Sequence, residues 1–274
     1  MQDYTNLLLS LDSGVLTVLI NRPAKLNALN KQTLADLGSC LSGAIADTSV
    51  RAILLSGAGD KAFVAGADIA EFAGLTPAQG EELARFGHQT VFNIIENSPK
   101  PILAAINGYA LGGGLELAMA CHIRIASTKA QLGLPELSLG LIPGYGGTQR
   151  LSKLIGKAKA MEFILLGTKI TSEQALSTGL VNEVVASDNL ISYSKELLEK
   201  IIKKSPLAIS AAIRAINASD NELVGQAQTN SLAQPLGHGY ETEIYEFSAL
   251  FGSSDFTEGV TAFLEKRDAH FTGQ

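Results

Sequence analysis

Cysteine, histidine and tryptophan are scarce in this chain of 274 residues. It contains two cysteines, Cys40 and Cys121, four histidines that are scattered singly, and no tryptophan. Two cysteines so far apart are too few for a disulfide framework and do not match the spacing of a zinc site. We therefore expect no metal site. Because 46% of the residues are hydrophobic, the chain has enough apolar material to fold around a core without such cross-links.

An excess of basic residues is also missing. The chain has 21 lysines and arginines against 27 aspartates and glutamates, for a formal net charge of −6. This balance argues against broad electrostatic binding to nucleic acid or to anionic membranes. A small anionic ligand is still compatible with it, because backbone amides and a few local cations can bind an anion.

Signals for export or membrane insertion are absent from the sequence. The start, MQDYTNLLLSLDSG, has neither a basic region nor an uninterrupted apolar run, so we expect a cytoplasmic protein. The apolar run at residues 101–121 is long enough to resemble a membrane span. However, Asn107, Glu116 and three consecutive glycines favour a strand, a turn and a buried helix there.

Strand and helix patterns alternate through the first half of the chain. Residues 6–20 predict a β-hairpin that turns at Asp12, Ser13 and Gly14. Strand-like runs at residues 51–57, 101–108 and 122–127 alternate with helical spacing at residues 34–46, 77–95 and 112–120. This alternation predicts an α/β fold with mostly parallel strands.

Beyond about residue 145 the strand patterns nearly vanish. Only residues 179–185 resemble a strand, and helical patterns follow at residues 188–204, 206–217 and 241–252. We therefore predict an α/β core at residues 1–195 that carries the active site, and a helical region at residues 196–274. Because no long linker separates them, the helices are expected to pack on the core or on a neighbouring subunit.

Two glycine-rich stretches could expose backbone amides. In FVAGAD at residues 63–68, Gly66 permits a tight turn, which either frees neighbouring N–H groups or simply lets Asp68 cap the next helix. In LGGGLELAMA at residues 111–120, the glycines remove side chains from the start of a helix, where unpaired N–H groups and the helix dipole can stabilise negative charge. Glu116 is either a favourable partner of that dipole or a functional carboxylate.

A second carboxylate follows in GLPELSLGLIPGYGG at residues 133–147. Pro135 can begin a short helix with Glu136 in its first turn. Glu136 lies 20 residues after Glu116, which is enough for one strand to leave and return to the same pocket. GYGGTQR has Gln149 where a dinucleotide-binding pattern needs its third glycine, so we do not expect a dinucleotide site.

A loop with two cations, NRPAKLNAL at residues 21–29, either shapes a turn or contacts a ligand phosphate.

Together these motifs resemble the enoyl-CoA hydratase/isomerase, or crotonase, family. They occur in the family's order: NRPAKLNAL, FVAGADI, AAINGYALGGGLELAMAC, LGLPELSLGLIPGYGGTQRL, GLVNEVV and FLEKRD. The resemblance implies an α/β, crotonase-like spiral of ββα units with a helical C-terminal trimerisation region, and a homotrimer or homohexamer. It also implies an acyl-CoA thioester as substrate and no separate cofactor, because coenzyme A is part of the substrate.

The resemblance further implies the residues of the site. The backbone N–H groups of Ala67 and Gly113 are expected to form an oxyanion hole for the thioester oxygen. Glu116 is expected to hold and activate water and Glu136 to donate a proton to C2, which predicts reversible syn-hydration of trans-2-enoyl-CoA to 3-hydroxyacyl-CoA. The expected substrate contacts are Lys25, Ala65, Gly66, Ala67, Asp68, Ile69, Gly113, Phe263 and Lys266.

The chain departs from the family pattern at two places. Leu115 stands where hydratases often carry a small residue or cysteine, which bears on packing under the acyl chain. Ala70 and Glu71 stand where some relatives place a lysine. Lys25 and Lys266 are therefore the candidates for contacting the CoA phosphates.

Two other functions occur in the same family. A Δ3-Δ2 enoyl-CoA isomerase is the alternative, since one carboxylate suffices to move a proton between C2 and C4, whereas this chain keeps both glutamates. One branch binds RNA through a lysine-rich helix, but the corresponding helix here contains only Lys31. We therefore expect no nucleic-acid partner and no membrane association.

Overall fold

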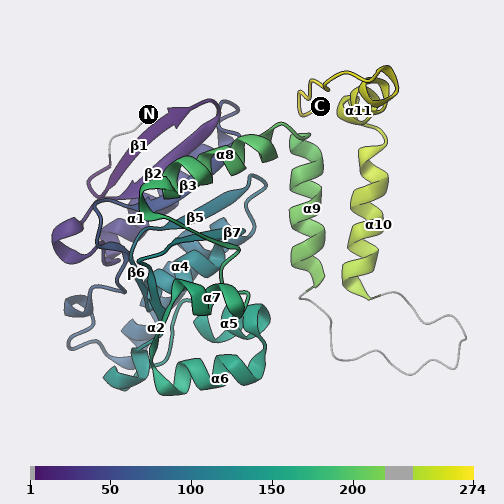
Figure 1. The fold of residues 1–274 in the computed structure, drawn as a ribbon. Helices are drawn as coiled ribbons and strands as arrows, with labels where there is room; N and C mark the ends of the chain where they lie inside the picture. Colours follow the sequence, from purple (N-terminus) through teal and green to yellow (C-terminus); the bar gives the residue numbers. More distant parts are fainter. Residues whose placement is uncertain (1–3, 220–236) are drawn as a thin grey trace, which may run out of the picture. The chain divides into compact units, whose positions relative to one another are not determined.

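The computed structural model describes residues 4–219 and 237–274 (Figure 1). The chain divides into two compact units, the first made of residues 1–96 and 101–199 and the second of residues 97–100 and 200–274. The division predicted after residue 195 stays a prediction, and residues 220–236 of its second region lie outside the described residues. In the described ranges, no helix combines the length and the apolar character needed to cross a membrane.

A six-stranded sheet forms the centre of the first unit. Its order is β1 (Leu7–Asp12), β2 (Val15–Ile20), β3 (Ala52–Gly57), β5 (Ile102–Ile106), β7 (Ile123–Ser127) and β10 (Glu183–Val185). The first two strands form the predicted antiparallel hairpin, and the other neighbours pair in parallel. Ser13 and Gly14 have φ values of +49° and +81°, the conformation that a two-residue hairpin turn requires.

A second sheet consists of four strands of three residues each. It contains β4 (Ala62–Val64), β6 (Tyr109–Leu111), β8 (Gln131–Gly133) and β9 (Lys169–Thr171), in that order. The expectation of a single strand region beyond residue 145, at residues 179–185, is therefore wrong. β9 is a further strand, and β10 covers only residues 183–185 of that run. Three residues are too few to show an alternating pattern, so local sequence does not identify them.

The chain winds between the two sheets in a repeating order. One strand of the large sheet is followed by one strand of the small sheet and then by a helix: β3, β4 and α2 (Pro77–Gly87); β5, β6 and α4 (Gly113–Ala120); β7, β8 and α5 (Gly147–Ile155). The predicted spiral of ββα units is thereby confirmed. Because each helix begins after a strand of the small sheet, the helix starts lie near one another.

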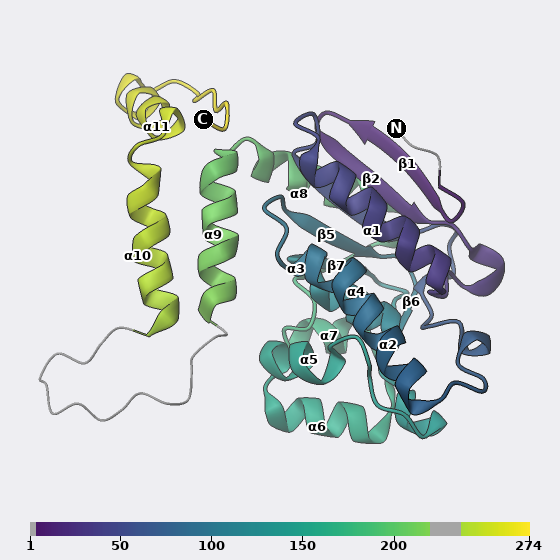
Figure 2. The same cartoon turned by 180° about the vertical axis from the view of Figure 1, so that it is seen from behind.

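Helices α1 (Lys31–Ala46), α3 (Asn93–Glu96) and α4 lie against one face of the large sheet (Figure 2). Asn30 caps α1 by accepting a hydrogen bond from the backbone N–H of Thr33. Leu34, Leu37 and Leu41 recur at helical spacing and are fully buried in the core cluster. Each such side chain contributes about 2 kcal/mol through burial, which holds the helix layer in register with the sheet.

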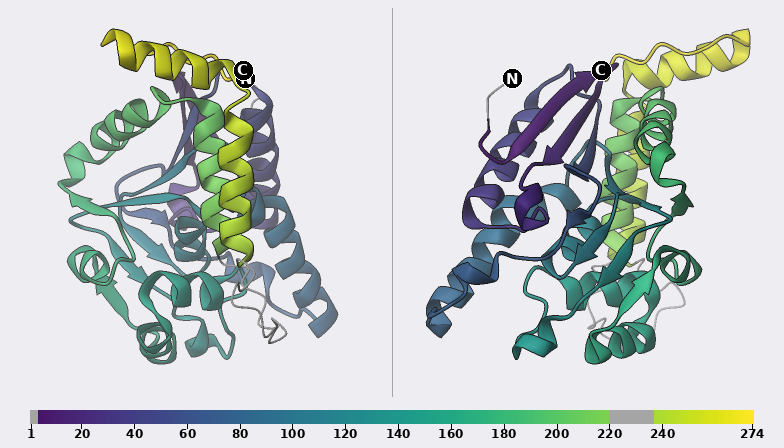
Figure 3. Two further views of the ribbon diagram at one scale, coloured as in Figure 1. Left: turned by 90° about the vertical axis from the view of Figure 1, so that its right-hand side faces the viewer. Right: turned by 60° about the vertical axis from the view of Figure 1, so that its left-hand side comes forward.

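The first unit also contains α6 (Lys157–Leu166), α7 (Ser172–Ser177) and most of α8 (Leu190–Ile202). In the second unit, α9 (Pro206–Ala218) and α10 (His238–Leu250) lie side by side, and α11 (Ser254–Glu265) follows (Figure 3). Arg214 of α9 donates to both carboxylate oxygens of Glu246 on α10, at 2.6 and 2.7 Å. Large aromatic side chains of α10 and α11 remain exposed: Tyr240, Tyr245, Phe247, Phe256 and Phe263.

Candidate active site

A cavity of about 520 Å³ opens where the ββα units bring their helix starts together. This volume is in the range of small-molecule sites. Seven of the predicted site residues line it: Ala65, Gly66, Ala67, Ile69, Gly113, Glu116 and Glu136. The structure therefore gathers, in one cavity, residues from three successive units of the spiral.

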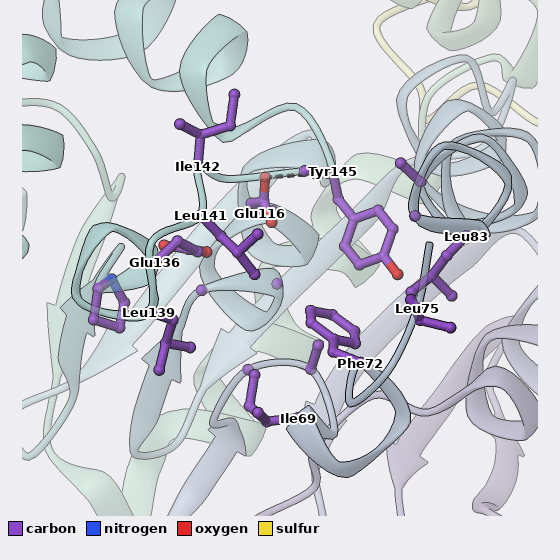
Figure 4. Close-up of a pocket in the computed structure, with 18 of the residues that line it drawn as sticks. Ile69, Phe72, Leu75, Leu83, Glu116, Glu136, Leu139, Leu141, Ile142 and Tyr145 are labelled. Carbon is purple, nitrogen blue, oxygen red and sulfur yellow. Dashed lines mark hydrogen bonds between the residues drawn. The ribbon is translucent and has the colours of Figure 1, made fainter. Parts of the chain in front are cut away.

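Apolar side chains form most of the remaining cavity wall (Figure 4). They come from the segment before α2, from α2 itself and from the segment between β8 and α5: Phe72, Leu75, Leu83, Leu139, Leu141, Ile142 and Tyr145. Leu115, which departs from the family pattern, is fully buried in the core and does not belong to the residues that line this cavity. Such a surface suits a hydrocarbon chain and excludes water from the carboxylates.

Two backbone amides, those of Ala67 and Gly113, lie close together at the cavity. The turn before Asp68 is fixed by Leu29, whose N–H donates to the Gly66 carbonyl at 2.9 Å and whose carbonyl accepts from the Asp68 N–H at 2.7 Å. Neither of these two hydrogen bonds uses the Ala67 N–H. The N–H of Gly113 has no partner within α4, because Gly113 is the first residue of that helix. A Cβ on Gly113 would lie 3.7 Å from the Ala67 nitrogen, so the two amides are close.

The glycines before Glu116 meet two separate requirements. Gly112 has φ +49° and ψ −126°, a conformation that L side chains rarely adopt. Gly114 packs against β4, where an added Cβ would lie only 2.0 Å from the Val64 carbonyl oxygen. Glycine at both positions therefore lets the chain turn sharply and brings the start of α4 against the Ala67 turn.

Glu116 lies in the first turn of α4 and is almost completely buried, with 1% of its surface exposed. Its Oε1 accepts hydrogen bonds from the backbone N–H groups of Tyr145, at 2.8 Å, and Gly147, at 2.7 Å. The pKa of this carboxyl is raised from 4.5 to about 7, mainly by burial and also by the nearby charge of Glu136, although the two amides and Arg150 act in the opposite direction. Glu116 is therefore suited to exchange a proton near neutral pH.

Glu136 begins the short 3-10 helix η4 (Glu136–Leu139), as the sequence predicted for the segment after Pro135. Its Oε1 lies beside Gly112, at 2.9 Å from the position that a Cβ on Gly112 would occupy. Its Oε2 is buried and has no hydrogen-bond partner among the described residues. Burial raises the pKa of this carboxyl above its usual range. Both carboxyls of the cavity therefore hold a proton more readily than an exposed glutamate does.

Two of the predicted substrate contacts lie outside the described cavity lining. Asp68 pairs with Arg22, whose Nη2 donates to Oδ2 at 2.9 Å, and this hydrogen bond lowers the pKa of Asp68. Asp68 also stands at the N-cap position of η2 (Ile69–Glu71), although its side chain makes no capping hydrogen bond of normal geometry there. Lys25 is exposed at the end of η1 (Pro23–Lys25). Their contacts with substrate stay predictions.

The other two predicted contacts belong to the second unit. Phe263 is 82% exposed near the end of α11, and Lys266 ends that helix with φ +56°. Their role in CoA binding also stays a prediction.

Sequence reasoning did not single out Tyr145, Arg150 or Glu96. The Tyr145 ring stacks on Phe92 at a centroid distance of 4.8 Å. The guanidinium of Arg150 is almost fully buried against Glu96. The sequence signal for Arg150 was weak. It is an arginine three residues after the glycine pair of GYGGTQR, in a segment that otherwise has the pattern of an amphipathic helix.

Comparison with known proteins identifies the family of this chain. The profile of the family described as Enoyl-CoA hydratase/isomerase matches residues 10–274. A crotonyl-CoA hydratase of Syntrophomonas wolfei is 39% identical over 268 residues, covering 98% of each chain. A short-chain-enoyl-CoA hydratase of Clostridium acetobutylicum is 40% identical over 265 residues, covering 97% of each chain.

Solved structures agree as well. The crystal structure of an enoyl-CoA hydratase from Bacillus anthracis superposes with a TM-score of 0.88 at 36% identity, covering 98% of this chain and 100% of that one. The match extends over both sheets and the C-terminal helices, so the similarity is not confined to the motifs. The chain therefore belongs to the enoyl-CoA hydratase/isomerase family.

Proposed function

We propose that this enzyme catalyses the reversible syn-hydration of trans-2-enoyl-CoA to 3-hydroxyacyl-CoA. The observation that carries the proposal is the presence of two carboxylates, the buried Glu116 and the half-buried Glu136, in the same cavity as the backbone amides of Ala67 and Gly113. Addition of water needs a base, an acid and a site for the developing negative charge. All three kinds of group line this cavity.

The proposed reaction begins with water held by ionised Glu116. Glu116 accepts a proton as the water oxygen bonds to C3, and the electron pair of the C2–C3 double bond moves through C1 onto the thioester oxygen. The N–H groups of Ala67 and Gly113 stabilise the resulting enolate by donating hydrogen bonds to that oxygen. Protonated Glu136 then gives its proton to C2, and the thioester carbonyl forms again. Dehydration follows the same steps in reverse.

The substrate is an acyl-CoA thioester, which the family membership supports. The apolar cavity wall accommodates the hydrocarbon part of the acyl group, and the CoA part extends outwards. Lys25 and Lys266 are the proposed partners of the CoA phosphates. Coenzyme A enters and leaves as part of the substrate, so the reaction as proposed uses no other cofactor.

We further propose that the chain assembles as a homotrimer or homohexamer. The exposed aromatic side chains on α10 and α11 support this, because such faces usually become buried against a partner surface. Light scattering of the purified protein tests the proposal, and an active monomer would contradict it.

The catalytic proposal is tested by offering the purified enzyme crotonyl-CoA, hexenoyl-CoA and octenoyl-CoA and separating the products by chromatography. The expected product is the 3-hydroxyacyl-CoA, with loss of the absorbance of the conjugated double bond. Glu116→Gln and Glu136→Gln are each expected to lower turnover about a hundredfold or more. Near-normal hydration by either variant would contradict the two-carboxylate mechanism, and conversion of 3-enoyl-CoA without any hydration would favour the isomerase.

A further inference from the structure

Arg150 carries a buried guanidinium whose bonds form a clamp. Its Nη2 and Nε donate to the two carboxylate oxygens of Glu96, at 2.7 and 3.2 Å. Its Nη1 donates to the Tyr145 carbonyl at 2.8 Å. A planar guanidinium that is bound on both sides has a fixed orientation. A Cβ on Gly146, which has φ +99°, would lie 2.2 Å from Nη1, so the turn passes directly over the guanidinium.

The same turn holds Glu116. The peptide units of the turn present the N–H groups of Tyr145 and Gly147 to Oε1, while the Tyr145 carbonyl points to Arg150. A continuous chain of hydrogen bonds therefore runs from Glu96 on α3, through Arg150 on α5 and the turn, to Glu116 on α4. Arg150 is absent from the cavity lining, so it acts on Glu116 through the turn.

We propose that Arg150 is a positioning residue for the hydration reaction, because its clamp fixes the Tyr145–Gly147 turn that holds one oxygen of Glu116 and leaves the other for water. The inference rests on the proposed function. A carboxylate whose support is lost can rotate away from the line of attack on C3, and a misplacement of about 1 Å costs about a hundredfold in rate. The ground-state binding of the thioester does not depend on this carboxylate oxygen.

Arg150 also affects the proton affinity of Glu116. The ionisable groups that face Glu116 are Glu136 from η4, Arg150 from α5 and the Tyr145 phenol, and His88 lies against the far side of the Tyr145 ring. Of these, only Arg150 lowers the pKa of Glu116. Its removal is expected to raise that pKa and to move the acid limb of the rate profile to higher pH.

The test compares wild type with Arg150→Met, Arg150→Lys and Glu96→Gln, measuring kcat and KM for crotonyl-CoA from about pH 5 to pH 9. For Arg150→Met we expect kcat to fall about tenfold to a hundredfold with KM changed less than about threefold. The acid limb of the rate profile should move to higher pH, because Arg150 lowers the pKa of Glu116. Arg150→Lys keeps the positive charge but lacks the planar set of N–H donors of the guanidinium. Its acid limb should therefore lie at the wild-type pH, while its kcat should stay below that of the wild type. Glu96→Gln should lower kcat without raising the acid limb.

Arg124→Met is the matched control, because Arg124 is equally buried and bonds the carbonyls of Leu180, at 2.8 Å, and Cys121, at 2.6 Å, away from the cavity. It should lower stability without moving the acid limb. A folded Arg150→Met variant with the wild-type kcat and pH profile would overturn the inference. So would a wild-type kcat in Glu96→Gln, or a shift of the acid limb in Arg124→Met as large as that in Arg150→Met. A wild-type enzyme that does not hydrate crotonyl-CoA would instead overturn the proposed function.

Discussion

Glu116→Gln should make the protein more stable at alkaline pH while it removes the activity. Glutamine keeps an oxygen that can accept hydrogen bonds from the N–H groups of Tyr145 and Gly147, while it removes the charge and replaces the other oxygen by an NH2 group. In the wild type, ionising this buried carboxyl works against the folded state, because desolvation raises its pKa from 4.5 to about 7. At about 1.4 kcal/mol per pKa unit, this difference amounts to about 3 kcal/mol.

The sign of the pH dependence follows from the direction of the pKa change. A carboxyl whose pKa is higher in the folded than in the unfolded protein binds its proton more tightly when folded. Its contribution to stability is therefore fully present below about pH 4.5 and is lost as the pH rises through about 7. Between about pH 5 and pH 8.5, the wild type should lose about 3 kcal/mol relative to Glu116→Gln.

Urea unfolding at these two pH values, at one protein concentration, measures the difference. Glu162→Gln is the control, because Glu162 is an exposed glutamate whose side chain is 57% accessible in an ion pair with Lys159. It should follow the wild type at both pH values. If the free energies of unfolding of the wild type and Glu116→Gln change in parallel with pH, then burial does not raise the pKa of Glu116 and the reasoning fails.

The remaining predictions concern catalysis, the cavity and assembly. Hydration kcat/KM should fall below about pH 7, because Glu116 must be ionised to accept a proton; a flat rate profile from pH 5 to pH 7 would contradict this. Gly113→Pro removes one amide donor at the first position of α4, where proline is tolerated, so turnover and the affinity for an enolate-mimicking thioester should collapse in calorimetry. Full affinity in a folded variant would place the oxyanion hole elsewhere. Gly80→Leu adds a side chain to open space at the cavity wall and should reduce turnover of octenoyl-CoA more than of crotonyl-CoA. Gly43→Leu, also in open space on a helix but outside the cavity, should leave that ratio unchanged. Deletion from Asp255 onwards should weaken both assembly and CoA binding, and light scattering that shows an unchanged oligomer would refute this.

The amino-acid sequence by itself predicted the large sheet, the order of its helices and the two glutamates. The apolar run at residues 101–108 predicted a buried strand because this signal depends only on neighbouring residues, and β5 (Ile102–Ile106) lies within it. The hairpin turn at Ser13 and Gly14 and the glycine-led start of α4 are equally local. The family motifs then supplied an expectation for how these parts act together.

The tertiary structure decided what depends on residues far apart in the chain. The small sheet exists because its three-residue strands pair with one another, and none of them carries a pattern of its own. Asp68 binds Arg22, which lies 46 residues earlier in the chain. Arg150 binds Glu96 across 54 residues, and Glu116 receives its amides from 29 and 31 residues further along. The raised pKa of Glu116 arises from burial by the assembled core, because desolvation depends on every group packed around the carboxyl and not on its sequence neighbours.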